Sequence, residues 1–133
     1  MNFLLDTNVL SDMFRRNRTV AAWLAAHEDA CAISAITTME LERGVLLLER
    51  RDPRQAIRLR RWFDEWVLPE FAWRTHGVDT DVALRAAALH VPDPVPINDA
   101  YIAATAQVHD LTVVTRNVAD FARTGVLVIN PYD

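Results

Sequence analysis

Short blocks of apolar and polar residues alternate along the chain and predict strands interleaved with helices. Four apolar runs of three or four residues have the length, the β-branched or aliphatic character and the polar flanks of buried strands. These runs are 3–5, 31–33, 112–114 and 126–129. Strands that alternate with helices favour an α/β fold with a central, mostly parallel sheet of four to five short strands, flanked by helices.

The segments between these runs carry apolar residues at helical spacing, as at Leu59, Trp62 and Trp66. Pro53 fits the first turn of a helix, whereas three prolines within 90–96 remove donors, fix φ and exclude one. The segments expected to be helical are 9–14, 20–26, 35–51, 53 to about 68, 79–90 and 97–109.

Length and composition predict one domain over residues 1–133, because a chain of this size with 51% hydrophobic residues can bury a core. No apolar run approaches the ~20 residues that span a bilayer. Asp6 and Asp12 stand where a secretory signal would be basic and then apolar. Cys31 is the only cysteine, which excludes an internal disulfide and a cysteine-rich zinc site. We expect a soluble, cytoplasmic protein without a membrane segment.

All 14 basic residues are arginines, against 18 acidic residues and a formal net charge of -4. This balance does not resemble that of a protein that coats DNA. The absence of lysine excludes chemistry that needs a lysine amine, such as Schiff bases and Walker-type phosphate loops.

Polar residues follow three of the predicted strands, and a further acid opens a helix. They are Asp6, Thr7 and Asn8, then Ser34 leading to Glu40, Thr115 and Asn117 leading to Asp120, and Asp99 after the proline segment. The carboxyl ends of parallel strands share one edge, so these acids are expected to converge. Two carboxylates ~4 Å apart repel by about 4 kcal/mol at an effective dielectric of 20, unless a proton or a hard cation lies between them. Carboxylates without histidine or thiol partners favour Mg²⁺ or Mn²⁺.

Each acid also has a purely structural interpretation. Asp6 can cap a helix, Glu40 has capping-box spacing from Thr37, Asp99 suits a helix N-terminus, and Asp120 fits a turn. Their convergence at one sheet edge is what favours a site.

Four blocks in order resemble the PIN-domain ribonucleases, and within them the VapC-type toxins of toxin–antitoxin pairs. The blocks are Leu4 to Leu10, Ile33 to Thr37 with Glu40-Leu41-x-x-Gly44, Asn98 to Ala106, and Val113 to Phe121. The resemblance implies a PIN fold, a divalent-metal endoribonuclease acting on RNA, and a homodimer neutralised by a VapB-type antitoxin. Carried over by position, it makes Asp6, Glu40 and Asp99 the metal-binding acids.

The fourth acidic position departs from the family pattern. Many relatives have aspartate where this chain has Asn117, and here Asp120 follows one helical turn later. We expect Asp120 to contribute more than Asn117, and the hydroxyls of Thr7 and Thr115 to orient acids or water. Glu42 projects about 200° away from Glu40 on a helix and is not expected at the site.

The predicted reaction is hydrolysis of RNA by a metal-activated water. An aspartyl-phosphate phosphatase would need a second aspartate at Asn8, and a phospho-receiver domain would need a lysine. A PIN-like scaffold that binds partners without cleaving stays open.

Arg54, Arg58 and Arg61 share one helical stripe, which fits either a phosphate track or a solvated face paired with acids such as Glu65. The solvated face is favoured. Trp62 and neighbouring aromatics are expected in the core or at an interface, with Trp62 and Trp66 as candidates for a surface covered by the antitoxin or a second subunit. The four histidines lack metal-ligand spacing.

Overall fold

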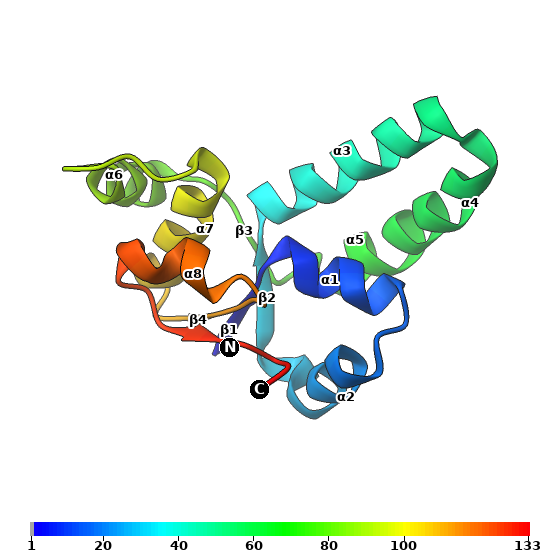
Figure 1. The fold of residues 1–133 in the computed structure, drawn as a ribbon, viewed down its shortest axis with the longest axis horizontal. Helices are drawn as coiled ribbons and strands as arrows, with labels where there is room; N and C mark the ends of the chain where they lie inside the picture. The colour runs from blue at the N-terminus through cyan, green and yellow to red at the C-terminus, as the bar shows by residue number, and fades with distance from the viewer. Residues whose placement is uncertain (1) are drawn as a thin grey trace.

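Five parallel strands form a sheet at the centre of the molecule, in the order β3-β2-β1-β4-β5 (Figure 1). The structure is a computed structural model and describes residues 2–133. The strands are β1 (Phe3–Leu5), β2 (Cys31–Ser34), β3 (Thr75–His76), β4 (Thr112–Val114) and β5 (Val128–Ile129). The prediction of an α/β fold with four to five mostly parallel strands is confirmed.

Strand β3 has no counterpart among the predicted strands. It has two residues, Thr75 and His76, and pairs with Ile33 and Ser34 of β2. A strand this short has no apolar run and no alternation to identify it, so only its pairing with β2 defines it.

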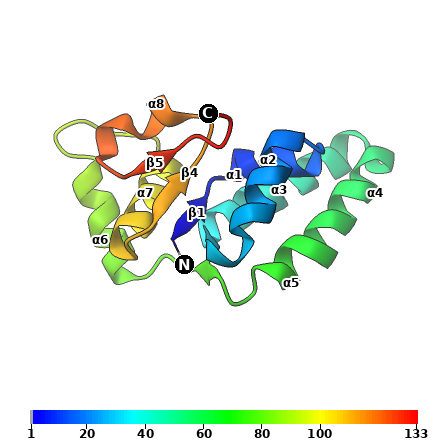
Figure 2. The same cartoon turned by 90° about the horizontal axis from the view of Figure 1, so that it is seen from below.

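Helices cover both faces of the sheet, with α6 and α7 on one side of β1 and β4, and α2 to α5 on the other (Figure 2). A π-helical turn, η2 (Phe63–Val67), joins α4 to α5 within the segment predicted as one helix to about residue 68. The α-helices are α1 (Thr7–Phe14), α2 (Arg18–His27), α3 (Ala35–Arg51), α4 (Pro53–Trp62), α5 (Leu68–Glu70), α6 (Thr80–Leu89), α7 (Ile97–Val108) and α8 (Val118–Phe121).

The core has two halves because neighbouring strand residues point to opposite faces of the sheet. Leu5 and Val114 pack in the cluster formed with α1 to α4, whereas Leu4 and Val113 pack against α7 and Phe121. Buried strands therefore fix the sheet between two helical layers and bring their polar exits to one edge.

Helices α3 and α4 form a hairpin that extends away from the sheet (Figure 1). Arg60 clamps the two helices, donating to Glu42 at 2.6 Å and to Glu49 at 3.0 Å, and lies 3.3 Å from Asp64. The expected pair between Arg61 and Glu65 is wrong: among residues 2–133, Arg61 makes no ion pair. The reason is that α3 supplies its acids on the face of α4 that carries Arg60.

No helix within residues 2–133 is both long enough and apolar enough to cross a membrane.

Candidate active site

The neighbouring strands β2, β1 and β4 end at one edge of the sheet. The last residue of β2 is polar, and so is the residue that follows each of β1 and β4. Asp6 follows β1 and caps α1, its Oδ1 accepting from the backbone N of Thr7 at 2.8 Å. Ser34 ends β2 and caps α3 by accepting from the backbone N of Ile36. Thr115 follows β4 and is fully buried. The predicted convergence of strand exits is thus present in the fold.

Asp6 is buried, with 6% of its surface exposed, and both of its oxygens accept hydrogen bonds. Oδ2 accepts from Thr115 Oγ1 at 2.8 Å and from Asn8 Nδ2 at 3.1 Å. Burial raises the pKa of the Asp6 carboxyl, the bonds from Thr115 and Thr7 oppose that rise, and the charge of Glu40 adds to it. Asp6 therefore caps α1, and hydrogen bonds hold its carboxylate in place although burial disfavours the charged form.

Glu40 lies in the second turn of α3, and its charge acts on Asp6. Its Oε1 accepts from Thr7 Oγ1 at 2.6 Å, and its Oε2 accepts from Asn98 Nδ2 at 3.3 Å. The alternative of a capping box with Thr37 is wrong, because Ser34 caps α3 and the Glu40 carboxylate bonds to side chains of α1 and α7. Glu42 points away and pairs with Arg60, as its helical position predicts.

Asp99 lies in the first turn of α7, half-buried. Its pKa is raised from 3.8 to about 6, first by burial and then by the charges of Asp6, Asp120 and Glu40. The fields of three acids therefore reach Asp99, which places all four predicted acids in one electrostatic cluster. We call Asp6, Glu40, Asp99 and Asp120 the acid cluster.

No arginine of residues 2–133 forms an ion pair with the acid cluster. The arginine ion pairs in this part of the chain go to other acids. A hard cation suits such a set of carboxylate oxygens. In the described part of the chain no three acidic, histidine or cysteine side chains stand close enough to form a preformed metal site.

The two candidates for the fourth position differ in what they touch. Asp120 is exposed on α8, and its charge raises the pKa of both Asp6 and Asp99. Asn117 reaches the site through its backbone N, which donates to Thr115 Oγ1 at 3.0 Å. The structure therefore brings the charge of Asp120 to the cluster.

Two asparagines have a role at the site that the sequence did not assign to them. Asn8 Nδ2 donates to Asp6 and to Thr115, and Asn98 donates to Glu40. Both belong to the family-like blocks, within two residues of Asp6 or Asp99, which is the signal that could have identified them. They hold the carboxylates of Asp6 and Glu40 in place from α1 and α7.

Asp12 is a further acid that the sequence did not mark. It is buried at 5% exposure on α1, and both of its oxygens accept from Arg116 Nη1, at 3.0 and 2.9 Å. The hydroxyl of Tyr132, near the C-terminus, also donates to Asp12, and burial together with this bond raises the pKa of the phenol. Arg116 directly follows Thr115, so Asp12 ties the β4 exit to α1.

Replacing Asp12 with alanine is expected to lower the free energy of unfolding by about 2 kcal/mol, because charge-assisted hydrogen bonds from Arg116 and Tyr132 are lost. Urea denaturation measures this change. Asp29→Ala, at an exposed acid, is the control and is expected within about 0.5 kcal/mol of the wild type. Equal effects of the two substitutions would contradict a structural role for Asp12.

Comparison with known proteins places this site in a family context. The PIN-domain family profile matches residues 3–127. The chain is 39% identical to toxin FitB of Neisseria gonorrhoeae, over 97% of each chain. It is 42% identical to ribonuclease VapC14 of Mycobacterium tuberculosis, over 68% of this chain and 89% of the relative.

Solved structures show the same fold over the whole chain. A structure of FitAB bound to a DNA fragment matches with a TM-score of 0.88 and 34% identity, covering 98% of this chain and 96% of that one. A toxin–antitoxin complex from Klebsiella pneumoniae matches with a TM-score of 0.72 and 34% identity, covering 99% of each chain.

Proposed function

The chain belongs to the PIN-domain family, among its VapC- and FitB-type toxin ribonucleases, and we propose that it hydrolyses RNA with Mg²⁺ or Mn²⁺ held by Asp6, Glu40 and Asp99. Ribonucleases of this family are typically metal-dependent. Family membership removes the phosphatase and phospho-receiver alternatives. A PIN-like scaffold without activity is the remaining alternative.

One observation carries the proposal of a metal-dependent site. The charges of Asp6, Glu40 and Asp120 act on Asp99 and raise its pKa to about 6, and no arginine of the described residues pairs with any of these four acids. Arg116, which directly follows Thr115 of the site, makes its side-chain contacts with Asp12. A protein maintains such repulsion when a cation relieves it in the working state.

The residues around the acids orient them. Thr115 and Asn8 fix the carboxylate plane of Asp6, and Thr7 with Asn98 does the same for Glu40. Such fixed partners of metal-binding groups keep ligands in position when an ion enters. Mg²⁺ held by Asp6, Glu40 and Asp99 would lower the pKa of a water molecule and stabilise negative charge on the phosphate.

Cleavage products test this reaction. Incubation of the protein with a mixed RNA pool and magnesium is expected to give fragments with 5′-phosphate and 3′-hydroxyl ends, because water attacks the phosphorus atom. Attack by the ribose 2′-hydroxyl would leave 2′,3′-cyclic phosphates instead. Ligation-based end analysis distinguishes the two, and cyclic-phosphate ends would overturn the mechanism.

Asp120 is proposed to contribute to metal affinity more than Asn117. Its carboxylate adds a full charge to the field at Asp6 and Asp99, whereas the Asn117 amide supplies only a dipole. Calorimetry is expected to show manganese binding weakened about tenfold in Asp120→Asn and little changed in Asn117→Ala. Unchanged affinity in Asp120→Asn with a marked loss in Asn117→Ala would leave a three-carboxylate site and assign the fourth position to Asn117.

We propose that the toxin works as a homodimer and that a small VapB-type antitoxin protein neutralises it. The similarity to a solved toxin–antitoxin complex over 99% of the chain supports this partner.

A further inference from the structure

We propose that a groove between α1 and the α3–α4 hairpin binds the RNA strand on one side of the scissile phosphate, an inference that rests on the proposed ribonuclease function. The groove consists of two open cavities of about 490 and 590 Å³. Thr7 and Glu40 line the inner cavity, so it begins at the acid cluster. Phe14 and Trp62 line both cavities, so the two cavities adjoin at these rings.

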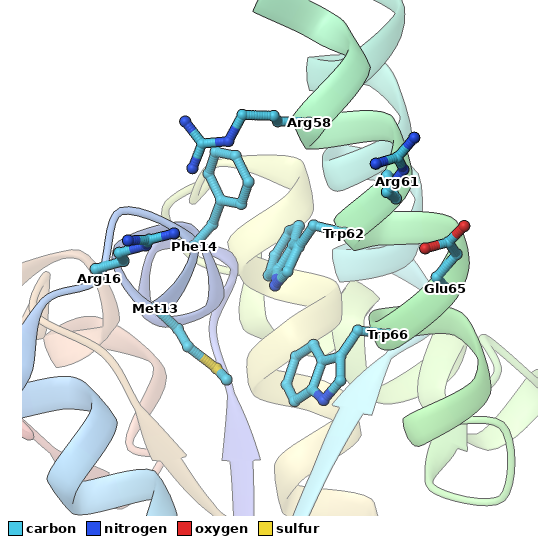
Figure 3. A pocket seen from close by; sticks show the side chains of 8 residues that line it. All are labelled: Met13, Phe14, Arg16, Arg58, Arg61, Trp62, Glu65 and Trp66. Atoms are coloured by element: carbon cyan, nitrogen blue, oxygen red, sulfur yellow. The ribbon is translucent and has the colours of Figure 1, made fainter.

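Aromatic rings lie where the two cavities meet, and we call Phe14, Trp62 and Trp66 the aromatic waist. Phe14 of α1 and Trp62 of α4 have ring centroids 5.1 Å apart at a tilt of 52°, and Trp66 lies nearly parallel to Trp62, 6.0 Å away. Figure 3 shows these rings facing the space between the helices, with Met13 opposite Trp66. The rings are half-buried: Trp62 and Trp66 pack on the core and also keep part of their surface in the groove. Such rings bind bases of any sequence by stacking.

Exposed arginines surround the aromatic waist. The inner cavity is lined by Arg15 and Arg51, and the outer cavity by Arg16, Arg58 and Arg61. Among residues 2–133 these arginines make no ion pair, except that Arg15 lies 3.6 Å from Asp12. They therefore offer guanidinium groups for phosphates, although the chain as a whole is acidic.

Arg58 links the charged and the aromatic parts of the groove. Its guanidinium carbon lies over the Phe14 ring, 5.7 Å from the centroid, and Figure 3 shows it at the mouth beside Trp62. Arg58 is exposed, as expected for a solvated face, but among residues 2–133 it forms no ion pair with an acid. In a nucleic-acid strand, bases could stack on the rings and phosphates could bind the arginines beside them.

The position of the groove selects RNA as its occupant. A phosphodiester that reaches Glu40 and Asp6 must continue on either side, and the inner cavity opens at Glu40. A strand that follows this cavity away from Glu40 would pass Arg51 and the ring of Trp62, which also line it. Charge complementarity and continuity with the acid cluster together support a single strand of nucleic acid here.

Binding of a fluorescein-labelled, mixed-sequence 12-nucleotide RNA in excess EDTA tests the proposal without cleavage. The double variant Arg51→Gln with Arg58→Gln is expected to bind more weakly and to reduce the slope of log K against log salt by about 1.4, since each lost contact to a single strand removes about 0.7. Arg18→Gln with Arg85→Gln is the matched control at exposed arginines outside both cavities. A double variant that binds RNA like this control overturns the proposal.

Trp62→Ala separates stacking from charge. It is expected to weaken RNA binding about tenfold with an unchanged salt slope. Trp73→Ala is its control, because Trp73 is 95% exposed and lies outside the groove. Trp62 also contacts the core. If Trp62→Ala unfolds below the assay temperature, the result for the double variant of Arg51 and Arg58 alone tests the proposal.

A small diester distinguishes failure of this inference from failure of the proposed function. Hydrolysis of bis(p-nitrophenyl) phosphate with Mn²⁺ is expected to be unchanged in the arginine double variant, while kcat/KM on RNA falls. A wild-type protein that cleaves neither substrate refutes the proposed function, whatever the groove binds. If the arginine variant keeps its RNA affinity but no longer binds the antitoxin, the groove is a protein interface and the proposal is wrong.

Discussion

Asp99→Asn is expected to reduce RNA cleavage by about a hundredfold or more while raising the melting temperature of the metal-free protein. A metal-held carboxylate site supplies several kcal/mol of transition-state stabilisation, and each 1.36 kcal/mol is a factor of ten in rate. The amide removes a charge that the acid cluster repels in the absence of metal. The rise is expected to be on the order of a few °C. Asp6→Asn should also abolish cleavage while raising or sparing the melting temperature, since asparagine remains a good helix cap.

The pH dependence follows from the direction of the pKa shift. The pKa of Asp99 in the folded protein is about 6, above its ordinary value of 3.8, so protons bind the folded state more tightly. The stability this group contributes is fully present below pH 4 and is lost as the pH rises through about 6. Melting curves in EDTA should show a larger loss in the wild type than in Asp99→Asn, in which Asp6, whose pKa is also raised, remains.

Asp81 provides a matched control for Asp99. Both are acids in the first turn of a helix, Asp81 on α6 and Asp99 on α7. If Asp99 served only to stabilise its helix N-terminus, Asp99→Asn and Asp81→Asn would lower the melting temperature to a similar extent, and cleavage would survive in both.

Metal removal is expected to have an equally large effect on the wild type. Excess EDTA should abolish RNA cleavage and added magnesium should restore it, because the acid cluster alone provides no group that acidifies water. Magnesium at a hundredfold excess over its Kd should also stabilise the fold by about 2.7 kcal/mol. Full activity in excess chelator would contradict a metal-dependent reaction.

The acid cluster could be located from the sequence because its members follow short, strongly apolar strands. A buried run that ends at Asp6 or Thr115 fixes both the strand and its exit, and parallel pairing then brings the exits together. Family-like blocks added Glu40 and Asp99, whose helices place them at the same edge.

Features that depend on contacts between distant segments were not accessible in this way. The partners of Glu40 come from α1 and α7, so a local capping pattern suggested the wrong interaction. Arg60, rather than Arg61, pairs with acids because the α3–α4 hairpin sets which face of α4 meets α3. The groove arises from the approach of α1 to α4, which no local pattern in either helix specifies.

Manganese titration by calorimetry tests the central claim that the acid cluster is a metal site. Wild type and Asp81→Asn are expected to bind Mn²⁺ saturably with the same affinity, and Asp99→Asn is expected to bind it at least tenfold more weakly. Equal binding by all three proteins, or no saturable binding by the wild type, would contradict the account.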